Sequence, residues 1–403
     1  GTQDANNGIV TGVSTGTAAI SYTNAAGCSR VFTVTVTGAM TPNTGNALVC
    51  MGQTTTLSNA TSGGVWSTGA LGIANVNSGT GVVTPVSVGN ANITYTTTSP
   101  AACRSVTQVT VNAAMPNNTG TATVCVGNTT TLSNAVSGGT WSSSNGNVSV
   151  VGSTGVITGV TAGTSVVTYA LSSGCTKTSI VTVNPLPNAI GGTFSVCEAS
   201  STTLTNSTGG GTWASSNTAV GTINSSTGAV TGLSAGTTLI TYRLSTTGCQ
   251  VTQQFTVNPR PAVFGGSLLV CQGSTSTLTS SPSGGVWTSS APLIAPVSSL
   301  GVVSGTALGT ANITYTQGGC FRSATVTVGV TPTTITGNHI VCYNQTSTLA
   351  STPTGHTWSS GNTAVATVNS STGVVYGVNT GTATISYTHS NGCSATTVVT
   401  VST

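Results

Sequence analysis

The chain has 403 residues, but only 2% of them are charged and its formal net charge at pH 7 is +4. A typical soluble protein has about 25% charged residues, so most of this surface must consist of Thr, Ser, Asn, Gln and Gly. The six Lys and Arg residues are too scattered for binding to nucleic acid, and no apolar run approaches the roughly 18 residues of a transmembrane segment.

A pattern of Cys, Trp, Tyr and Cys returns along the chain and predicts a tandem array. One partial repeat, the C-terminal half only, comes first and five full repeats follow. The expected boundaries are 1–37 for the partial repeat and 38–112, 113–184, 185–258, 259–328 and 329–403 for the full repeats. Because the first residues already lie inside a repeat and do not resemble a signal peptide, we expect an interior piece of a longer chain.

Each full repeat is expected to form about seven strands of a small antiparallel β-sandwich. In chain order they are a first strand ending near a Cys, a Thr-rich second strand, a strand with the Trp, two short strands, a strand with the Tyr, and a last strand rich in Val and Thr. Side chains alternate along these strands: Ala91, Ile93 and Tyr95 share one face, while an asparagine and two threonines occupy the other. The fold class is therefore all-β.

The aromatic residues are expected in the cores of the sandwiches. Each Trp follows the first Cys of its repeat by 16 residues, and this fixed spacing favours a core position over a surface that stacks on sugars. The predicted core aromatic residues are Trp66, Trp141, Trp213, Trp287 and Trp358, with Tyr95, Tyr169, Tyr242, Tyr315 and Tyr387.

Eleven cysteines without metal-ligand spacing indicate disulfides and an oxidising, extracellular setting. A bond between the two cysteines of one repeat would close a loop of roughly 50 residues and contribute about 4 kcal/mol in the chain-entropy estimate. Cys28 would have no partner within this chain. The predicted pairs are Cys50 with Cys103, Cys125 with Cys175, Cys197 with Cys249, Cys271 with Cys320, and Cys342 with Cys393.

Two alternatives to this pairing remain open. If the first Cys lies at the end of its strand that is far from the second Cys, the two Cα atoms cannot come within the roughly 7 Å that a disulfide allows. Bonds between neighbouring repeats, such as Cys50 with Cys175, would then be possible, and free thiols are the third possibility.

The connection between repeats has a constant length. From the second Cys of one repeat to the first Cys of the next there are always 22 residues, as from Cys28 to Cys50 and from Cys103 to Cys125. This interval holds a last strand, a linker with proline and a first strand. Since proline favours stiff, extended spacers, we expect a defined angle and distance between neighbours.

The sequence offers little for catalysis, and we expect neither an enzyme nor a cofactor. The two acidic residues, Asp4 and Glu198, fall in different repeats and cannot form a catalytic pair. His339, His356 and His389 all lie in the last repeat and could approach one another as zinc ligands. The competing interpretation is three unrelated surface-loop residues.

Two stretches, SSTGVVYGVNTGTATISYT in the last repeat and STGVITGVTAGTSVVTY from Ser153, resemble the group 2-like bacterial immunoglobulin-like domains that occur in tandem in surface adhesins. VCVGNTTTL from Val124 is similar to the cysteine-bearing form found in large secreted proteins of Bacteroidota. The resemblance covers the whole chain and implies immunoglobulin-like sandwiches joined by short Pro-containing linkers. It supplies no catalytic or ligand residue to transfer. It also implies an exported fibre, with type IX secretion as one route.

We therefore expect a structural segment of a bacterial cell-surface or extracellular filament, a disulfide-stapled rod. The nearly uncharged surface predicts self-association into filaments, unless the same long chain simply continues. Donor-strand polymerisation is not expected, because the C-terminus follows a complete last strand. The alternative is a carbohydrate- or cell-binding adhesin module that binds surface glycans with the loops at the domain poles.

Overall fold

The computed structural model describes residues 2–3, 8–98 and 103–403, which form strands, turns and loops but no helix. The protein is an all-β tandem array of immunoglobulin-like sandwiches, as the sequence predicts. The chain divides into two compact units, each described by itself below: Gly1–Leu186 with Thr247–Cys249, and Pro187–Thr246 with Gln250–Thr403.

The first unit contains the partial repeat and the first two full repeats. The partial repeat has β1 (Thr2–Gln3), β2 (Val10–Thr11), β3 (Gly16–Thr23) and β4 (Ser29–Val36). The next repeat has β5 (Leu48–Cys50), β6 (Thr55–Thr56), β7 (Gly64–Thr68), β8 (Ala74–Val76), β9 (Val82–Pro85), β10 (Gly89–Thr97) and β11 (Arg104–Asn112). The third has β12 (Thr119–Gly120), β13 (Thr123–Cys125), β14 (Thr129–Ser133), β15 (Thr140–Ser143), β16 (Val148–Val150), β17 (Val156–Gly159), β18 (Gly163–Ala170) and β19 (Thr176–Asn184).

The second unit contains the last three repeats. The fourth repeat has β20 (Ser195–Cys197), β21 (Ser201–Thr203), β22 (Gly211–Ser215), β23 (Gly221–Ile223), β24 (Ala229–Gly232), β25 (Gly236–Leu244) and β26 (Gln250–Asn258). The fifth has β27 (Leu269–Cys271), β28 (Thr275–Thr277), β29 (Val286–Ser289), β30 (Val302–Ser304), β31 (Gly309–Gln317) and β32 (Cys320–Gly329). The sixth has β33 (Thr336–Gly337), β34 (Ile340–Cys342), β35 (Thr346–Ala350), β36 (Thr357–Ser360), β37 (Ala366–Val368), β38 (Val374–Gly377), β39 (Gly381–Thr388) and β40 (Ser394–Ser402).

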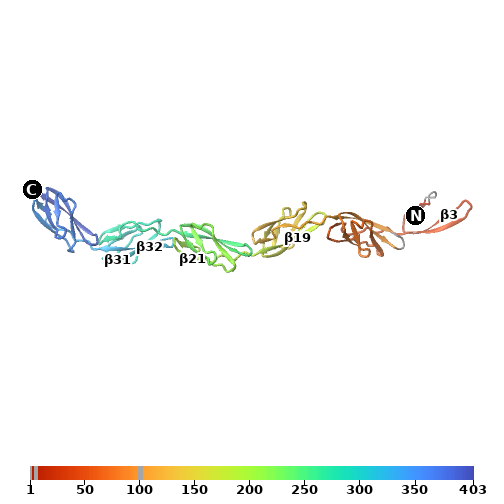
Figure 1. The fold of residues 1–403 in the computed structure, drawn as a ribbon, viewed down its shortest axis with the longest axis horizontal. Coiled ribbons are helices and arrows are strands. Elements are labelled where there is room, and N and C mark those ends of the chain that lie inside the picture. Colours follow the sequence, from red (N-terminus) through yellow and green to blue (C-terminus); the bar gives the residue numbers. More distant parts are fainter. Residues whose placement is uncertain (1, 4–7, 99–102) are drawn as a thin grey trace. The chain divides into compact units, whose positions relative to one another are not determined.

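Every full repeat has the same main sheet, with the strands in the order first, last, Tyr, Trp. In the third repeat this order is β13-β19-β18-β15, and the second sheet is β12-β14-β17-β16. The Tyr and last strands form a long antiparallel hairpin, which is seen clearly for β31 and β32 in Figure 1. The first strand pairs with the last strand in parallel, with Cys125 opposite Asn184. Both strands therefore finish at the same end of the sandwich.

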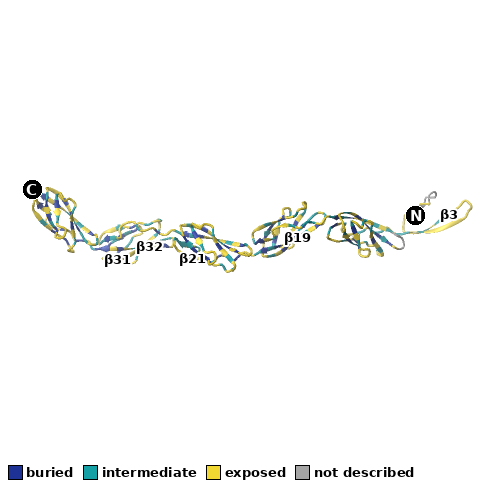
Figure 2. Cartoon of the chain, in the orientation of Figure 1, coloured by how far each residue is buried: buried dark blue, intermediate teal, exposed yellow. Residues whose placement is uncertain are grey.

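The Trp and Tyr side chains pack together inside each sandwich. The ring centroids of Trp141 and Tyr169 are 4.7 Å apart, and both residues are buried. The Tyr169 hydroxyl donates to the carbonyl of Val136 and accepts from the backbone N–H of Gly139, so its polar end is satisfied. Trp287 is buried only in part, in a repeat whose second sheet has just two strands. Dark blue in Figure 2 marks these cores.

Candidate functional site

Four disulfides join neighbouring repeats, and they are the most distinctive chemical feature of the chain. In each, the first Cys of one repeat is bonded to the second Cys of the next repeat, with Cα atoms 5.6–5.7 Å apart. The bonds are Cys50–Cys175, Cys125–Cys249, Cys197–Cys320 and Cys271–Cys393.

The predicted pairing within each repeat is wrong. The reason lies in the parallel pairing of the first and last strands. Cys125 lies opposite Asn184 at the end of β19, whereas Cys175 directly precedes β19. A strand of 9 residues separates them, which is about 30 Å at 3.3 Å per residue. No disulfide can span that distance, and the alternative bond between neighbours, Cys50–Cys175, is the one observed.

Three cysteines are free: Cys28 and Cys342, which are exposed, and Cys103, which is half-buried. Cys103 and Cys342 were expected in disulfides, and this prediction is also wrong. Cys103 is the second Cys of the first full repeat, and Cys342 is the first Cys of the last repeat. In the pattern of the four bonds, Cys103 would pair with the first Cys of the preceding repeat and Cys342 with the second Cys of a following repeat.

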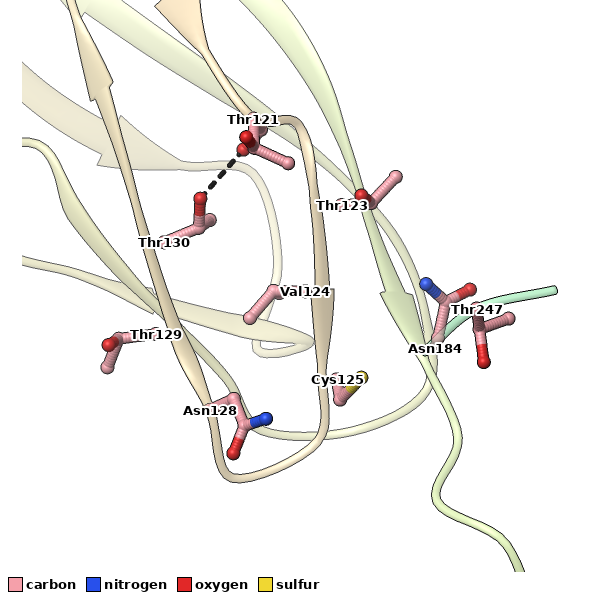
Figure 3. Close-up of a pocket in the computed structure, with 9 residues that line it drawn as sticks. All are labelled: Thr121, Thr123, Val124, Cys125, Asn128, Thr129, Thr130, Asn184 and Thr247. Atoms are coloured by element: carbon pink, nitrogen blue, oxygen red, sulfur yellow. Dashed lines mark hydrogen bonds between the residues drawn. The ribbon is translucent and has the colours of Figure 1, made fainter. Parts of the chain in front are cut away.

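The bond between Cys125 and Cys249 shows how such a joint is built. The Cys249 sulfur lies 4.0 Å from the carbonyl oxygen of Asn184, the residue opposite Cys125. Beside the bond is a pocket of about 260 Å³. Figure 3 shows Thr247 next to Asn184 at its edge, and Thr130 donating a hydrogen bond to the backbone of Thr121. The nine lining residues include no aromatic or charged side chain.

At the Cys271–Cys393 joint, a glycine in one repeat leaves room for an asparagine side chain from the next repeat. Gly329 replaces the Asn that ends the last strand in the three preceding full repeats. A Cβ atom at this glycine would lie 2.5 Å from the amide nitrogen of Asn391, which comes from the next repeat. Asn391 instead donates to the carbonyl of Val330 and accepts from the N–H of Cys393. The space is therefore filled from the other side of the joint.

Asparagines fix the linkers in place, a role that the sequence analysis did not find. The Asn43 amide donates to the carbonyl of Ser105 and accepts from Asn59. Asn118 likewise donates to the carbonyl of Lys177. Each of these two linkers is thus attached to the last strand of the repeat that follows it. The sequence feature that could have indicated this role is the Pro-Asn pair in each of the first two linkers.

Together, the disulfides and the constant 22-residue intervals form two interleaved covalent routes along the chain. We call them track one and track two. Track one runs through residues 28–50, the bond to Cys175, residues 175–197, the bond to Cys320, and residues 320–342. Track two runs through residues 103–125, the bond to Cys249, residues 249–271, and the bond to Cys393. The free thiols are open ends of these tracks.

Each full repeat flanked by two disulfides contains one strand from each track, side by side. In the third repeat, β13 belongs to track two and β19 to track one. The residues between the two cysteines, here called the body of the repeat, belong to neither track. The body contains the Trp strand, the Tyr strand and most of the second sheet, so neither route passes through the main part of the core.

The structure brings two of the three histidines together. The rings of His356 and His389 have centroids 3.7 Å apart, and the His389 Nδ1 accepts from the N–H of Asn391. Burial, followed by the charge of His389, lowers the pKa of His356. Among the described residues, no group of three His, Cys, Asp or Glu could hold a metal, so His339 does not complete a zinc site.

The absence of a catalytic carboxylate pair stays a prediction, because Asp4 lies outside the described residues. The Glu198 carboxylate accepts from the backbone N–H groups of Ala235 and Arg260, so it fixes a loop and the start of a linker. The described residues include no helix with the length and hydropathy of a membrane span.

A comparison with protein families gives one match. Residues 251–328 match the family described as bacterial Ig-like domain (group 2). The match covers the fifth repeat and the strand before it, which is less than half of the chain. No curated protein matches the sequence.

Solved structures with similar folds include adhesion and surface-layer proteins. The eight N-terminal Ig domains of Down Syndrome Cell Adhesion Molecule are 11% identical, with a TM-score of 0.26, over 96% of this chain and 63% of theirs. Surface layer protein SbsC domains 1–6 are 17% identical, with a TM-score of 0.20, over 68% and 52%. A C-terminal fragment of intimin is 16% identical, with a TM-score of 0.25, over 35% and 64%. The chain thus spans under two thirds of each, and scores this low carry no argument about function.

Proposed function

We propose that this chain is a load-bearing structural segment of an extracellular bacterial fibre, in which tension passes along the two covalent tracks. The interleaved disulfides are the observation that carries the proposal. Disulfides persist in oxidising compartments outside the cytosol, which supports the extracellular location. The family match of residues 251–328 supports a bacterial source.

The tracks would protect the cores from mechanical unfolding. In an ordinary tandem array, tension enters a domain at one end of its chain and leaves at the other, so the whole domain lies in the force path. Here the path from Cys50 to Cys320 passes through two disulfides and only residues 175–197. Fully extended, those 22 residues span about 75 Å, and most of them already lie in strands or an extended linker. Little length remains to be released.

The surface supports association of such fibres. With 2% charged residues, there is little electrostatic repulsion to keep neighbouring copies apart. Self-association into filaments is thus part of the proposal. We give less weight to glycan binding. Four of the five Trp side chains are buried and unable to stack on a sugar, and the pocket at Cys125 has no aromatic residue.

Single-molecule force spectroscopy of the oxidised chain, pulled by its two ends, tests the load-bearing function. The N-terminal end leads into track one at Cys28, and the C-terminal end leaves track two at Cys393. Every path between them must change track once, through the body of one full repeat. The five bodies connect the two tracks in parallel, so the total length released from the full repeats should not exceed that of one body, which is about 50 residues or at most about 175 Å of chain, however many bodies open. The partial repeat opens separately.

The same molecule with its disulfides reduced is the matched control. Without them, the backbone is the sole path, and all five full repeats should open in sequence. If the oxidised chain releases the length of all five bodies, the disulfides do not carry load and the proposal is wrong.

A further inference from the structure

The fourth repeat, which contains β21 in Figure 1, has a hollow of about 360 Å³ beside its core tryptophan. We call it the indole pocket. Its lining includes Thr205, Gly209, Trp213, Ser226 and Tyr242, and none of the lining residues is charged. The volume lies within the range of roughly 300–1,000 Å³ that is common for small-molecule sites. The pocket is therefore large enough for a small ligand.

The indole nitrogen of Trp213 is an unused hydrogen-bond donor at this pocket. Trp213 is 7% exposed, and no residue that the structure describes accepts a hydrogen bond from its Nε1. Among those residues, the buried side-chain atoms without a partner are Asn112 Nδ2, Gln317 Oε1 and His339 Nε2. Trp213 Nε1 is not one of them, so it is open to the pocket. A ligand oxygen that accepts from this N–H would satisfy the polar group of an otherwise buried ring.

A glycine keeps this donor uncovered. A Cβ atom at Gly228 would lie 3.1 Å from Trp213 Nε1. The turn itself favours glycine here, since φ of Gly228 is 73°, and the missing Cβ leaves the donor accessible. The sixth repeat has the same arrangement. A Cβ at Gly373 would lie 2.9 Å from Trp358 Nε1, and a smaller hollow of about 150 Å³ adjoins that Trp.

The residue four positions before the Trp differs between the two pockets. It is Gly209 in the fourth repeat and Thr354 in the sixth, and each lines its own pocket. The other three full repeats have serine at this position. A Cβ at Gly209 would meet no atom within 4 Å, so the space that a side chain would take is open. We attribute the larger volume in the fourth repeat to this missing side chain.

The lining groups fit a neutral ligand with several hydroxyl groups. Besides the indole N–H, the hydroxyls of Thr205 and Ser226 form no hydrogen bond to any described residue, and each can donate or accept. Because no lining residue is charged, an ionised ligand group would find no opposite charge. An added peptide strand finds no open edge, because the Trp213 backbone N–H already donates to the carbonyl of Ser225.

We propose that the indole pocket binds one neutral hexose unit of a glycan, with a sugar oxygen that accepts from the Trp213 indole N–H. Thr205 and Ser226, which come from two different loops, bond to other hydroxyls of the same sugar ring. The face of the indole stays buried in the core, so recognition uses its edge and needs no stacking. These residues lie between Cys197 and Cys249, in the body of the repeat, and the site is therefore separate from both tracks.

NMR spectroscopy of the full oxidised chain, labelled with nitrogen-15 in tryptophan, tests this site. The chain has five Trp residues and hence five indole N–H signals, and a Trp213→Phe variant identifies the signal of Trp213. The probes are the methyl glycosides of glucose, galactose and mannose, which are neutral, and methyl glucuronide, which carries a carboxylate. We expect at least one neutral glycoside to shift the Trp213 signal saturably, with a Kd on the order of millimolar, and methyl glucuronide to bind more weakly.

Exchange of the residues four positions before the Trp gives matched variants. Gly209→Thr places the residue of the sixth repeat in the fourth and should weaken binding about tenfold or more, because the side chain takes space in the pocket. Thr354→Gly is the converse and should let the same glycoside shift the Trp358 signal. Each residue occurs at this place in a folded repeat, so both variants should fold, and the remaining indole signals check this.

Three results would overturn the proposal. They are an unmoved Trp213 signal with all three neutral glycosides, equal affinity in the Gly209→Thr chain, and equal shifts of all five indole signals. Tighter binding of methyl glucuronide would overturn the neutral class of ligand. The measurement applies no force, so its outcome is independent of whether the tracks carry load.

Discussion

Cys125 ends strand β13 directly opposite Asn184, the last residue of the parallel strand β19. Cys175 lies at the other end of β19, so the two cysteines of this repeat belong to opposite ends of one sheet. Cys125 is bonded to the following repeat and Cys175 to the preceding one. The parallel pairing of the first and last strands thus turns a common sandwich topology into a covalently continuous array.

The pairing can be checked by thiol labelling of the native, oxidised chain. We expect Cys28 and Cys342 to react quickly with a maleimide because they are exposed, and Cys103 to react more slowly because it is half-buried against Thr37. The eight bonded cysteines should not react. Mass spectrometry of the unreduced digest should yield a peptide pair that contains Cys125 and Cys249. A pair that contains Cys125 and Cys175 would restore the pairing within repeats.

Removal of selected disulfides should change the length of chain that is released under force. Cys50→Ser alone cuts track one, but a path through one body still reaches track two, so the length of one body should be released. Cys50→Ser with Cys125→Ser cuts both tracks beside the third repeat. Every path between the chain ends then crosses at least three bodies, and force spectroscopy should show a released length of about three bodies.

The double variant Cys50→Ser with Cys103→Ser is the matched control, because it also loses two sulfurs but only one disulfide. We expect a released length of one body, as in the chain with Cys50→Ser alone. Equal released lengths in the two double variants would show that the tracks do not determine the force path.

The fold followed from the sequence because its signals are local. Alternation in strands such as the one that ends in Tyr95, and the constant spacing from Cys50 to Trp66, both depend on residues close in the chain. The disulfide pairing could not be derived in this way. It depends on the parallel pairing of first and last strands, a contact between residues such as Cys125 and Asn184 that are 59 positions apart. The constant 22-residue interval is visible in the sequence. Its role as a segment of a covalent track follows only from the parallel pairing of the first and last strands.

Gly139→Ala should destabilise the third repeat. A Cβ atom at this position would overlap the ring of Tyr169, whose hydroxyl accepts from the Gly139 N–H. Overpacking of this kind costs about 1–3 kcal/mol. Gly146→Ala in the same repeat is the control, since a Cβ there meets no atom within 4 Å. Hydrogen exchange of the amides in residues 113–184 measures both. Equal stability of the two variants would show that Tyr169 moves aside at no cost.

In the last repeat, His356 occupies the position of Gly139, and its N–H donates to the Tyr387 hydroxyl. Its ring packs against His389 and lies 5.9 Å from that of Tyr387, measured between centroids. Burial and the charge of His389 lower the pKa of His356. The folded repeat therefore binds this proton less readily than the unfolded chain, whose His pKa is about 6.5. Stability is complete above that value and should fall as the pH drops through the folded-state pKa.

Hydrogen exchange of residues 329–403 between about pH 7.5 and about pH 5 measures this loss. The third repeat, with glycine at the same position, should not show it. His356→Gly should remove most of the dependence, because the side chain whose pKa is lowered in the folded repeat is then absent. An NMR titration that places the pKa of His356 at or above 6.5 would contradict the prediction, since protonation would then cost the folded repeat nothing.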